Sequence, residues 1–155
     1  MSLGAQEHDL SARIQVLEDI EEIRRLKFLY CRLCDDGFDV EGLSKVFTED
    51  AVWTAGEEWG SYVGIEAIIN FFRTMPDAVS FSVHALSNGE IDVDGDSAKA
   101  RWRTLIPCSV IEENSHTPHW MFCDYYDEFR KVNGHWLISR IHGDVTRNVP
   151  HKDGW

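Results

Sequence analysis

Hydrophobic residues recur every three or four positions through the first part of the chain. That spacing predicts one apolar stripe along an α-helix. The acidic residues between 18 and 22 precede the basic residues between 24 and 27, an order typical of a solvated helix face with i,i+4 ion pairs. Gly37 can adopt the left-handed conformation that ends a helix, so we expect this helix to stop near Asp35. The stripe consists of Leu10, Ile14, Leu17, Ile20, Ile23, Leu26, Leu29 and Leu33.

Shorter elements are predicted next. Asp39 can cap a second helix that carries Leu43, Val46 and Phe47. A proline at position 76 ends the last helix of this region, because proline cannot donate a backbone hydrogen bond. Between these points we expect a strand over 51–54, a loop over 56–60, a short strand over 62–63 and a helix over 64–73.

From residue 78 onward the pattern changes to alternation, which is typical of half-buried strands. Asp94-Gly95 and Asn133-Gly134 are two-residue hairpin signals. Helices followed by a meander of strands predict a single α+β domain over 1–155. In it, N-terminal helices pack on a strongly curved mixed or antiparallel sheet, and the resulting cone encloses a pocket. The predicted strands are roughly 79–93, 97–111, 119–132 and 135–146, with a longer turn over 112–118.

Charge and hydropathy exclude several classes of partner. The formal net charge is -12, so the surface repels nucleic acid and anionic lipid. No run of about 18 apolar residues is present, and no secretory signal opens the sequence, so we expect a cytoplasmic protein. Cys31 and Cys34 form a C-x-x-C without a second ligand pair, and His116 and His119 adjoin the predicted turn. We therefore predict no metal, and the missing phosphate and dinucleotide motifs predict no cofactor.

Three segments carry a resemblance to a known family, namely 29–37 with 47–53, 62–64 with His84 and 93–96, and 125–130 with 133–136. Their local sequence resembles the NTF2-like superfamily, in its SnoaL-like branch. The resemblance covers nearly the whole chain and implies the cystatin-like cone. Since this fold hosts many activities, the resemblance alone leaves the function open.

Within this branch the chain resembles three groups of lyases, namely scytalone dehydratase, bile acid 7α-dehydratase and hexachlorocyclohexane dehydrochlorinase. All three pair an Asp at the end of the first helix with a His on the first long strand, and the matching positions are Asp35 and His84. The resemblance implies catalytic roles for both. Tyr30 matches a Tyr of the bile acid enzyme, and Trp53 matches a Trp of the dehydrochlorinase.

The chain differs from these lyases at several positions of their active sites. Arg147 is the nearest counterpart of an Arg on the bile acid enzyme's last strand, and Arg130 is a looser counterpart of an Arg in the dehydrochlorinase. An acidic residue of the bile acid enzyme has no counterpart. The two Tyr, the second His and the Ser of the scytalone dehydratase pocket are replaced by Cys34, Trp53, Cys108 and Cys123. Scytalone and bile acids are therefore not the expected substrates.

His84 and Asp35 together could remove a proton. A neutral imidazole accepts a proton near pH 7, and a carboxylate on its other ring nitrogen fixes the tautomer. Such a base contributes about 10²–10⁴-fold in rate, or about 3–5 kcal/mol. The alternative for His84 is a hydrogen-bonded structural residue, and for Tyr30 it is a core residue. Asp35 lies where a negative charge opposes the helix dipole, which favours a role beyond the turn.

The strands also predict two different sheet faces. Met121, Cys123 and Tyr125 share a face that we expect to line the pocket with Trp53, Cys108 and Arg147. The opposite face carries Trp120, Phe122 and Tyr126 and would need cover, which predicts a homo-oligomer, dimer or trimer, through the sheet.

The predicted function is a cofactor-independent, dehydratase-like lyase. His84, oriented by Asp35 and assisted by Tyr30, would act on a hydrophobic cyclic small molecule. An isomerase or polyketide cyclase would use the same residues. The rival class is a non-catalytic ligand-binding module or a protein like the small subunit of ring-hydroxylating dioxygenases. A hydrogen bond between His84 and Asp35 facing an open cavity would favour the enzyme.

Overall fold

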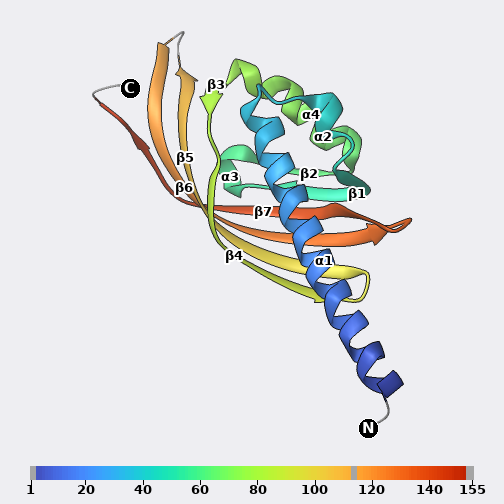
Figure 1. The fold of residues 1–155 in the computed structure, drawn as a ribbon. Helices are drawn as coiled ribbons and strands as arrows, with labels where there is room; N and C mark the ends of the chain where they lie inside the picture. Colours follow the sequence, from blue (N-terminus) through green and yellow to red (C-terminus); the bar gives the residue numbers. More distant parts are fainter. Residues whose placement is uncertain (1–2, 113–114, 153–155) are drawn as a thin grey trace.

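The computed structural model describes residues 3–112 and 115–152. Helices lie over one face of a strongly bent sheet (Figure 1), which confirms the α+β prediction. The elements are α1 (Leu3–Asp35), α2 (Val40–Leu43), β1 (Phe47–Thr54), α3 (Gly56–Trp59), β2 (Ser61–Val63), α4 (Ile65–Thr74), a 3₁₀ turn (Met75–Asp77), β3 (Val79–Ser82), β4 (Ala85–Asp94), β5 (Ser97–Glu112), β6 (Ser115–Val132) and β7 (His135–Pro150).

The seven strands of the described residues form one mixed sheet. Its order is β2-β1-β7-β6-β5-β3, and β4 pairs with β5 as well. β1 runs parallel to β7, and the other pairs are antiparallel. The hairpin between β6 and β7 turns at Asn133 and Gly134, whose φ angles of +51° and +81° suit the predicted two-residue turn.

Several predicted boundaries were wrong. Phe47 begins β1 instead of ending a helix, and residues 56–59 form the short helix α3 instead of a loop. The turn predicted over 112–118 is shorter, because β5 reaches Glu112 and β6 begins at Ser115, while residues 113–114 lie outside the described residues. Continuous strand pairing between β5 and β6 extends both strands into this polar segment.

The strand predicted over 79–93 is divided into β3 and β4, with Val83 and His84 between them. Both strands pair with β5, and the gap lies opposite Pro107, which has no N–H to donate. The backbone N–H of His84 donates to a carboxylate of α1 instead of to the sheet. Burial still alternates across the break, because Ser82 is buried, Val83 is exposed and His84 is half-buried, so His84 stays on the same face as Ser82.

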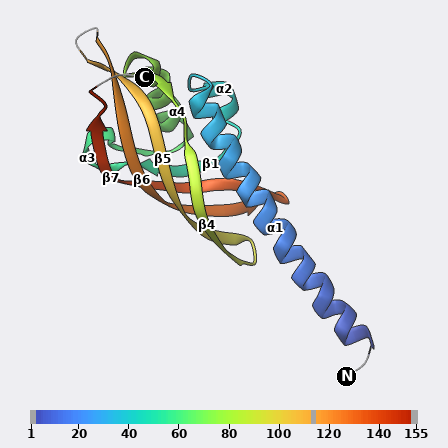
Figure 2. The ribbon, with the colours of Figure 1, turned by 60° about the vertical axis from the view of Figure 1, so that its left-hand side comes forward.

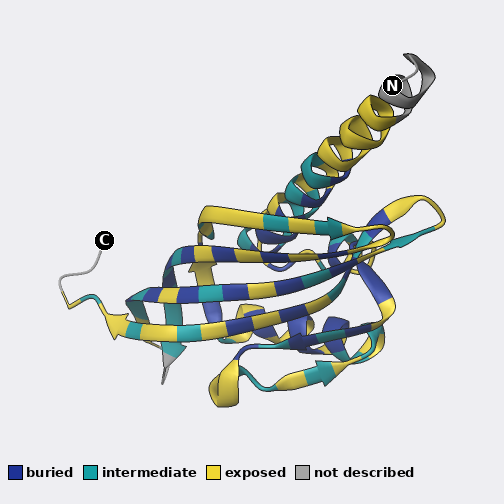
Figure 3. Cartoon of the chain, turned by 90° about the horizontal axis from the view of Figure 1, so that it is seen from below, coloured by how far each residue is buried: buried dark blue, intermediate teal, exposed yellow. Residues whose placement is uncertain are grey.

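The buried face of α1 differs from the predicted stripe. Leu10, Ile14 and Leu17 are 54%, 46% and 65% exposed, because the first half of α1 projects beyond the sheet (Figures 2 and 3). Further along, the leucines at 26, 29 and 33 are half-buried. The face that packs on the sheet carries Asp19, Ile23, Lys27, Tyr30 and Cys34, all buried.

The concave face of the sheet supplies the other half of the core. Burial alternates along the long strands, as the bands of colour in Figure 3 show. On β6, Met121, Cys123 and Tyr125 are buried and point inward, while Phe122 and Tyr126 are exposed and point outward. This alternation is what a half-buried antiparallel strand requires. Within the described residues, no helix has the length and apolar character needed to cross a membrane.

Candidate active site

Asp35 is the last residue of α1, and the chain turns away directly after it. Gly37 adopts a φ of +82°, and the N–H of Phe38 donates to the carbonyl of Cys34 at 3.1 Å. The predicted helix end is therefore correct, and glycine allows it. The turn holds the carboxylate of Asp35 against the break between β3 and β4.

Three hydrogen bonds fix the carboxylate of Asp35. Its Oδ1 lies 2.6 Å from Nδ1 of His84 and accepts from Ser82 Oγ at 3.2 Å, and its Oδ2 accepts from the backbone N–H of His84 at 2.9 Å. Backbone and side chain of His84 are thus bound by one carboxylate. The sequence offered a signal for Ser82, which lies two residues before His84, but the chemistry assigned to this segment did not include it.

The bond to Asp35 determines the tautomer of His84. A carboxylate accepts the proton of Nδ1, so Nε2 carries the lone pair that could take a proton from a substrate. The side chain of His84 is 10% exposed and forms part of the wall of an internal pocket. Asp35 does not line that pocket and borders a surface groove with Phe28 and Arg32.

The pocket lies between α1, α4 and the concave face of the sheet. About 590 Å³ of space lies between its walls and at its open mouth. Apart from His84, none of its described lining residues is of an acidic or basic type. The wall includes most of the predicted site residues, namely Tyr30, Trp53, His84, Cys108, Met121, Cys123 and Tyr125.

A SnoaL-like domain model matches residues 15–142, which contain every lining residue of the pocket except Val145. The chain belongs to the SnoaL-like domain family. This places the long helix, the sheet and the His84–Asp35 pair within one known domain type. No curated protein matches this SnoaL-like chain significantly.

Several solved structures are similar to this SnoaL-like domain. A type 2 hexachlorocyclohexane dehydrochlorinase (LinA) is 19% identical, with a TM-score of 0.82 over 90% of this chain and 93% of the other. A scytalone dehydratase candidate from Novosphingobium aromaticivorans is 23% identical, with a TM-score of 0.76 over 87% and 89%. An NTF2-like protein with a cystatin-like fold from the same organism is 27% identical, with a TM-score of 0.70 over 90% and 89%. These likenesses support the NTF2-like fold.

Arg147 does not line the pocket of this SnoaL-like domain, so its predicted placement was wrong, and Arg130 does not line it either. Arg147 is exposed on β7 and donates to the carbonyl of Thr146 at 2.7 Å. Arg130 is exposed on β6 and pairs with Asp50. Arg130 follows the outward positions of β6, and Arg147 is paired with the outward-facing Phe122 because the register of β6 and β7 shifts between Phe122 and Cys123. The described pocket therefore has no cation to pair with a substrate carboxylate.

Tyr30 is buried and forms a hydrogen bond with a second pocket residue. Its hydroxyl accepts from Nε1 of Trp53 at 2.9 Å. Burial raises the pKa of Tyr30 well above its usual value. The phenol therefore remains protonated and can donate a hydrogen bond but is a poor acid.

A fully buried ion pair lies behind the pocket, and the sequence interpretation missed it. Nζ of Lys27 is 2.9 Å from Oδ2 of Asp127, and both side chains are 0% exposed. The ammonium lies 3.7 Å from the ring centroid of Tyr125 and 4.8 Å from that of Tyr30. Lys27 was assigned to the solvated charged face. Its four- and three-residue spacing to Ile23 and Tyr30 was the signal that it lies on the buried stripe.

The thiols of the pocket are poor nucleophiles. Burial raises the pKa of Cys123 to about 12 and that of Cys108 to about 11. A thiol with such a pKa contains almost no thiolate at neutral pH. Cys34 and Cys31 are also free and buried, so the C-x-x-C of α1 contributes small apolar side chains to the core.

Among the described residues, no three His, Cys, Asp or Glu side chains gather where they could hold a metal ion. His119, which was predicted at the start of a strand beside a turn, lies within β6. Its side chain is buried, and its Nδ1 is 2.8 Å from Oδ1 of Asn148.

Proposed function

We propose that this SnoaL-like protein is a cofactor-independent lyase that eliminates water or halide from a hydrophobic cyclic molecule. The observation that carries the proposal is the 2.6 Å contact between Asp35 and Nδ1 of His84, with His84 in the wall of the pocket. A base with a fixed tautomer beside an apolar cavity is suited to removing a proton from carbon.

The reaction would proceed as follows. Nε2 of His84 takes a proton from a ring carbon, and the C–H electron pair forms the new double bond. The bond to the neighbouring oxygen or halogen breaks, and that group leaves with the bonding electrons. A leaving hydroxyl would receive the proton that His84 has just accepted. Tyr30 would donate a hydrogen bond to a substrate oxygen, because its raised pKa makes proton transfer unfavourable.

The lining of the pocket supports an uncharged substrate. Its described wall is mostly aromatic, aliphatic or sulfur-containing, and no Lys or Arg lies in it. A carboxylate moved into such a cavity would lose its hydration without gaining a counter-ion. The placement of Arg147 outside the pocket therefore argues against acids as substrates.

An isomerase is the second candidate, and a specific observation favours it. Among the described pocket residues, His84 is the only His, Asp, Glu, Lys or Arg, so one side chain would have to serve as both base and acid. A single base can remove a proton from one carbon and return it to another. An isomerisation needs no leaving group and would use the same dyad.

A substrate screen tests the proposal. Wild type and His84→Ala would be incubated with cyclic β-hydroxy ketones and with hexachlorocyclohexane, and products would be identified by mass spectrometry. We expect elimination by wild type and a rate about 10²–10⁴-fold lower in the mutant. Arg147→Ala, which lies outside the pocket, is the matched control. Equal turnover by wild type and His84→Ala would remove His84 from the mechanism.

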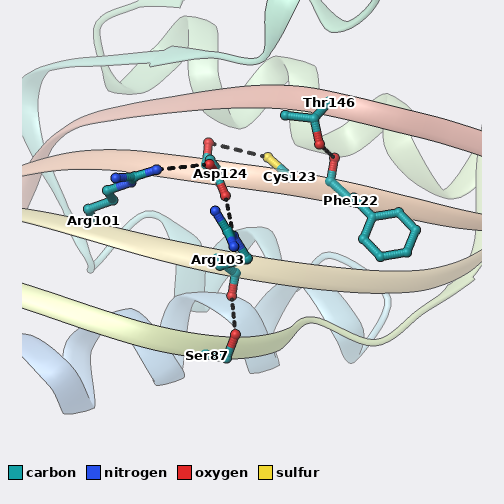
Figure 4. Close-up of polar contacts among 7 residues, drawn as sticks. All are labelled: Ser87, Arg101, Arg103, Phe122, Cys123, Asp124 and Thr146. Atoms are coloured by element: carbon teal, nitrogen blue, oxygen red, sulfur yellow. Dashed lines mark hydrogen bonds and ion pairs between the residues drawn. The ribbon is translucent and has the colours of Figure 1, made fainter.

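We also propose that the protein is a homo-oligomer, dimer or trimer, through the outer face of the sheet. Phe122 and Tyr126 are 44% and 41% exposed there. Beside them, Asp124 accepts from Arg101 at 3.2 Å and from Arg103 at 3.3 Å (Figure 4). Sedimentation equilibrium of wild type and Phe122→Asp tests this. We expect an oligomer that the mutation weakens, and a monomeric wild type would contradict it.

A further inference from the structure

Trp59 lies across the sheet from His84 but lines the same pocket. It ends α3, which stands beside β1 and β2 at one edge of the sheet, whereas His84 follows β3 at the other edge (Figure 1). The pocket is therefore lined by residues from both edges of the sheet. A bound molecule that fills it would contact both His84 and Trp59.

The indole N–H of Trp59 is buried and has no hydrogen-bond partner among the residues that the structure describes. Trp53, in the same wall, provides the contrast, because its indole N–H donates to the hydroxyl of Tyr30 at 2.9 Å. Most buried donors in native proteins have a partner, so an unpaired donor in a pocket wall suggests a missing ligand group. Indole can donate but not accept, so the ligand must supply an acceptor.

The backbone around Trp59 is held in place. Gly56 begins α3 and Gly60 follows it, with φ angles of +71° and +81°, a conformation that suits glycine. The N–H of Gly60 donates to the carbonyl of Gly56 at 3.1 Å, and the N–H of Ala55 donates to the carbonyl of Gly60 at 3.3 Å. Trp59 is thus carried by a closed single turn, so little order would have to be gained on binding.

We propose that Trp59 is a specificity-determining residue whose indole N–H donates to an oxygen of the substrate, distant from the carbon that His84 deprotonates. The inference rests on the proposed function and narrows its substrate class to oxygenated cyclic compounds. A carbon-bound halogen is a weak acceptor and would leave the donor poorly paired. The donor would therefore favour ketones or hydroxy ketones over polychlorinated rings.

Binding of a matched pair of ligands tests this inference. 1-Tetralone and tetralin have nearly the same shape, and only the ketone has an acceptor. Their affinities would be measured by calorimetry for wild type, Trp59→Phe and Trp120→Phe, the last being a control outside the pocket lining. We expect Trp59→Phe to weaken the binding of 1-tetralone about 3- to 10-fold, the range of one net hydrogen bond. The binding of tetralin should weaken less than about 2-fold.

Retained binding of tetralin by Trp59→Phe would show that the mutant pocket is intact. Equal weakening of both ligands, or no weakening of the ketone, would overturn the role of Trp59 and leave the proposed function standing. If wild type bound neither ligand, the proposed use of the pocket and the role of Trp59 would both fail.

Discussion

Helix α1 contributes one residue to each of two pairs of an acidic and a basic side chain, and the two pairs differ in burial. Lys27 and Asp127 are 2.9 Å apart and wholly buried, whereas Asp35 and His84 are 2.6 Å apart with side chains 21% and 10% exposed. Eight residues separate Lys27 from Asp35, which is about 12 Å along a helix. One helix therefore holds one pair behind the wall of the pocket and one pair at its edge.

The difference in burial gives the pairs different roles. Lys27 and Asp127 have lost their hydration and depend on each other, because breaking such a pair leaves an uncompensated charge. The carboxylate of Asp35 is partly hydrated and has two more donors, Ser82 Oγ and a backbone N–H. His84 can therefore change its protonation state without leaving a buried charge alone. We infer that the first pair serves folding and the second serves chemistry.

The largest expected effect comes from Lys27→Met. Removing the ammonium leaves Asp127 buried without its partner, so we expect the free energy of unfolding to fall by about 3–5 kcal/mol. Urea titration followed by circular dichroism measures it. The double mutant Lys27→Met/Asp127→Asn has no buried charge and should recover part of the loss. If the free energy of unfolding fell less in Lys27→Met than in the double mutant, the two side chains would not be coupled as described.

The same mutant has a pH signature. Burial raises the pKa of Asp127, and Lys27 opposes that shift. Without Lys27 the pKa rises further above the unfolded value, so the folded state binds the proton more tightly than the unfolded state. The stability of Lys27→Met relative to wild type should therefore improve as the pH falls below this raised pKa and worsen as the pH rises. Unfolding at several pH values checks this, and the opposite slope would contradict it.

The next effect concerns catalysis. In Asp35→Asn, the amide can donate to Nδ1 as well as accept from it, so the tautomer of His84 is no longer fixed. We expect the rate of elimination or isomerisation to fall about 10²–10³-fold, while the free energy of unfolding changes by about 1–2 kcal/mol. Steady-state kinetics and urea titration on the same preparation separate the two. Full activity in the mutant would show that Asp35 does not orient the base.

A smaller effect concerns the reactivity of the cysteine that lies between the two pairs. Cys31 lies on α1 between them, and burial raises its pKa to about 12. At pH 8 we expect iodoacetamide to label none of the four cysteines of the folded protein, and all four in urea. Lys27 opposes the rise in the pKa of Cys31, so Lys27→Met should leave Cys31 unlabelled as long as the protein stays folded. Rapid labelling of folded wild type, detected by mass spectrometry, would mean that this region is open.

The smallest effect is expected from Arg147→Ala. The side chain is exposed on β7 and its guanidinium bonds only a neighbouring carbonyl in the described contacts. We expect stability within about 0.5 kcal/mol of wild type. The rate with an uncharged substrate should be unchanged. A loss of activity would show that this arginine contributes to the active site.

The main elements of the fold could be predicted because local signals mark them, whereas the pair Asp35–His84 was predicted from the resemblance to lyases of the SnoaL-like branch. Gly37 marks the helix end, the Asn133-Gly134 turn marks a hairpin, and alternation along β6 separates its two faces. Lys27 and Arg147 were misplaced for different reasons. Lys27 was assigned to the solvated face because a single charged residue on an apolar stripe resembles the charged residues beside it. Arg147 was assigned to the pocket because the sequence does not reveal the register shift in the pairing of β6 with β7. Burial of Lys27 depends on Asp127, 100 residues away in sequence, which no local pattern encodes.

The exchange of carbon-bound hydrogen with solvent tests the central claim most directly. 2-Tetralone in D₂O would be followed by proton NMR with wild type, His84→Gln and buffer alone. If His84 removes a proton from carbon, wild type should speed deuterium incorporation well above buffer, and His84→Gln should lower the enzymatic rate about 10²–10⁴-fold. Exchange at the same rate in wild type and His84→Gln, or no acceleration while the ketone is bound, would contradict the account.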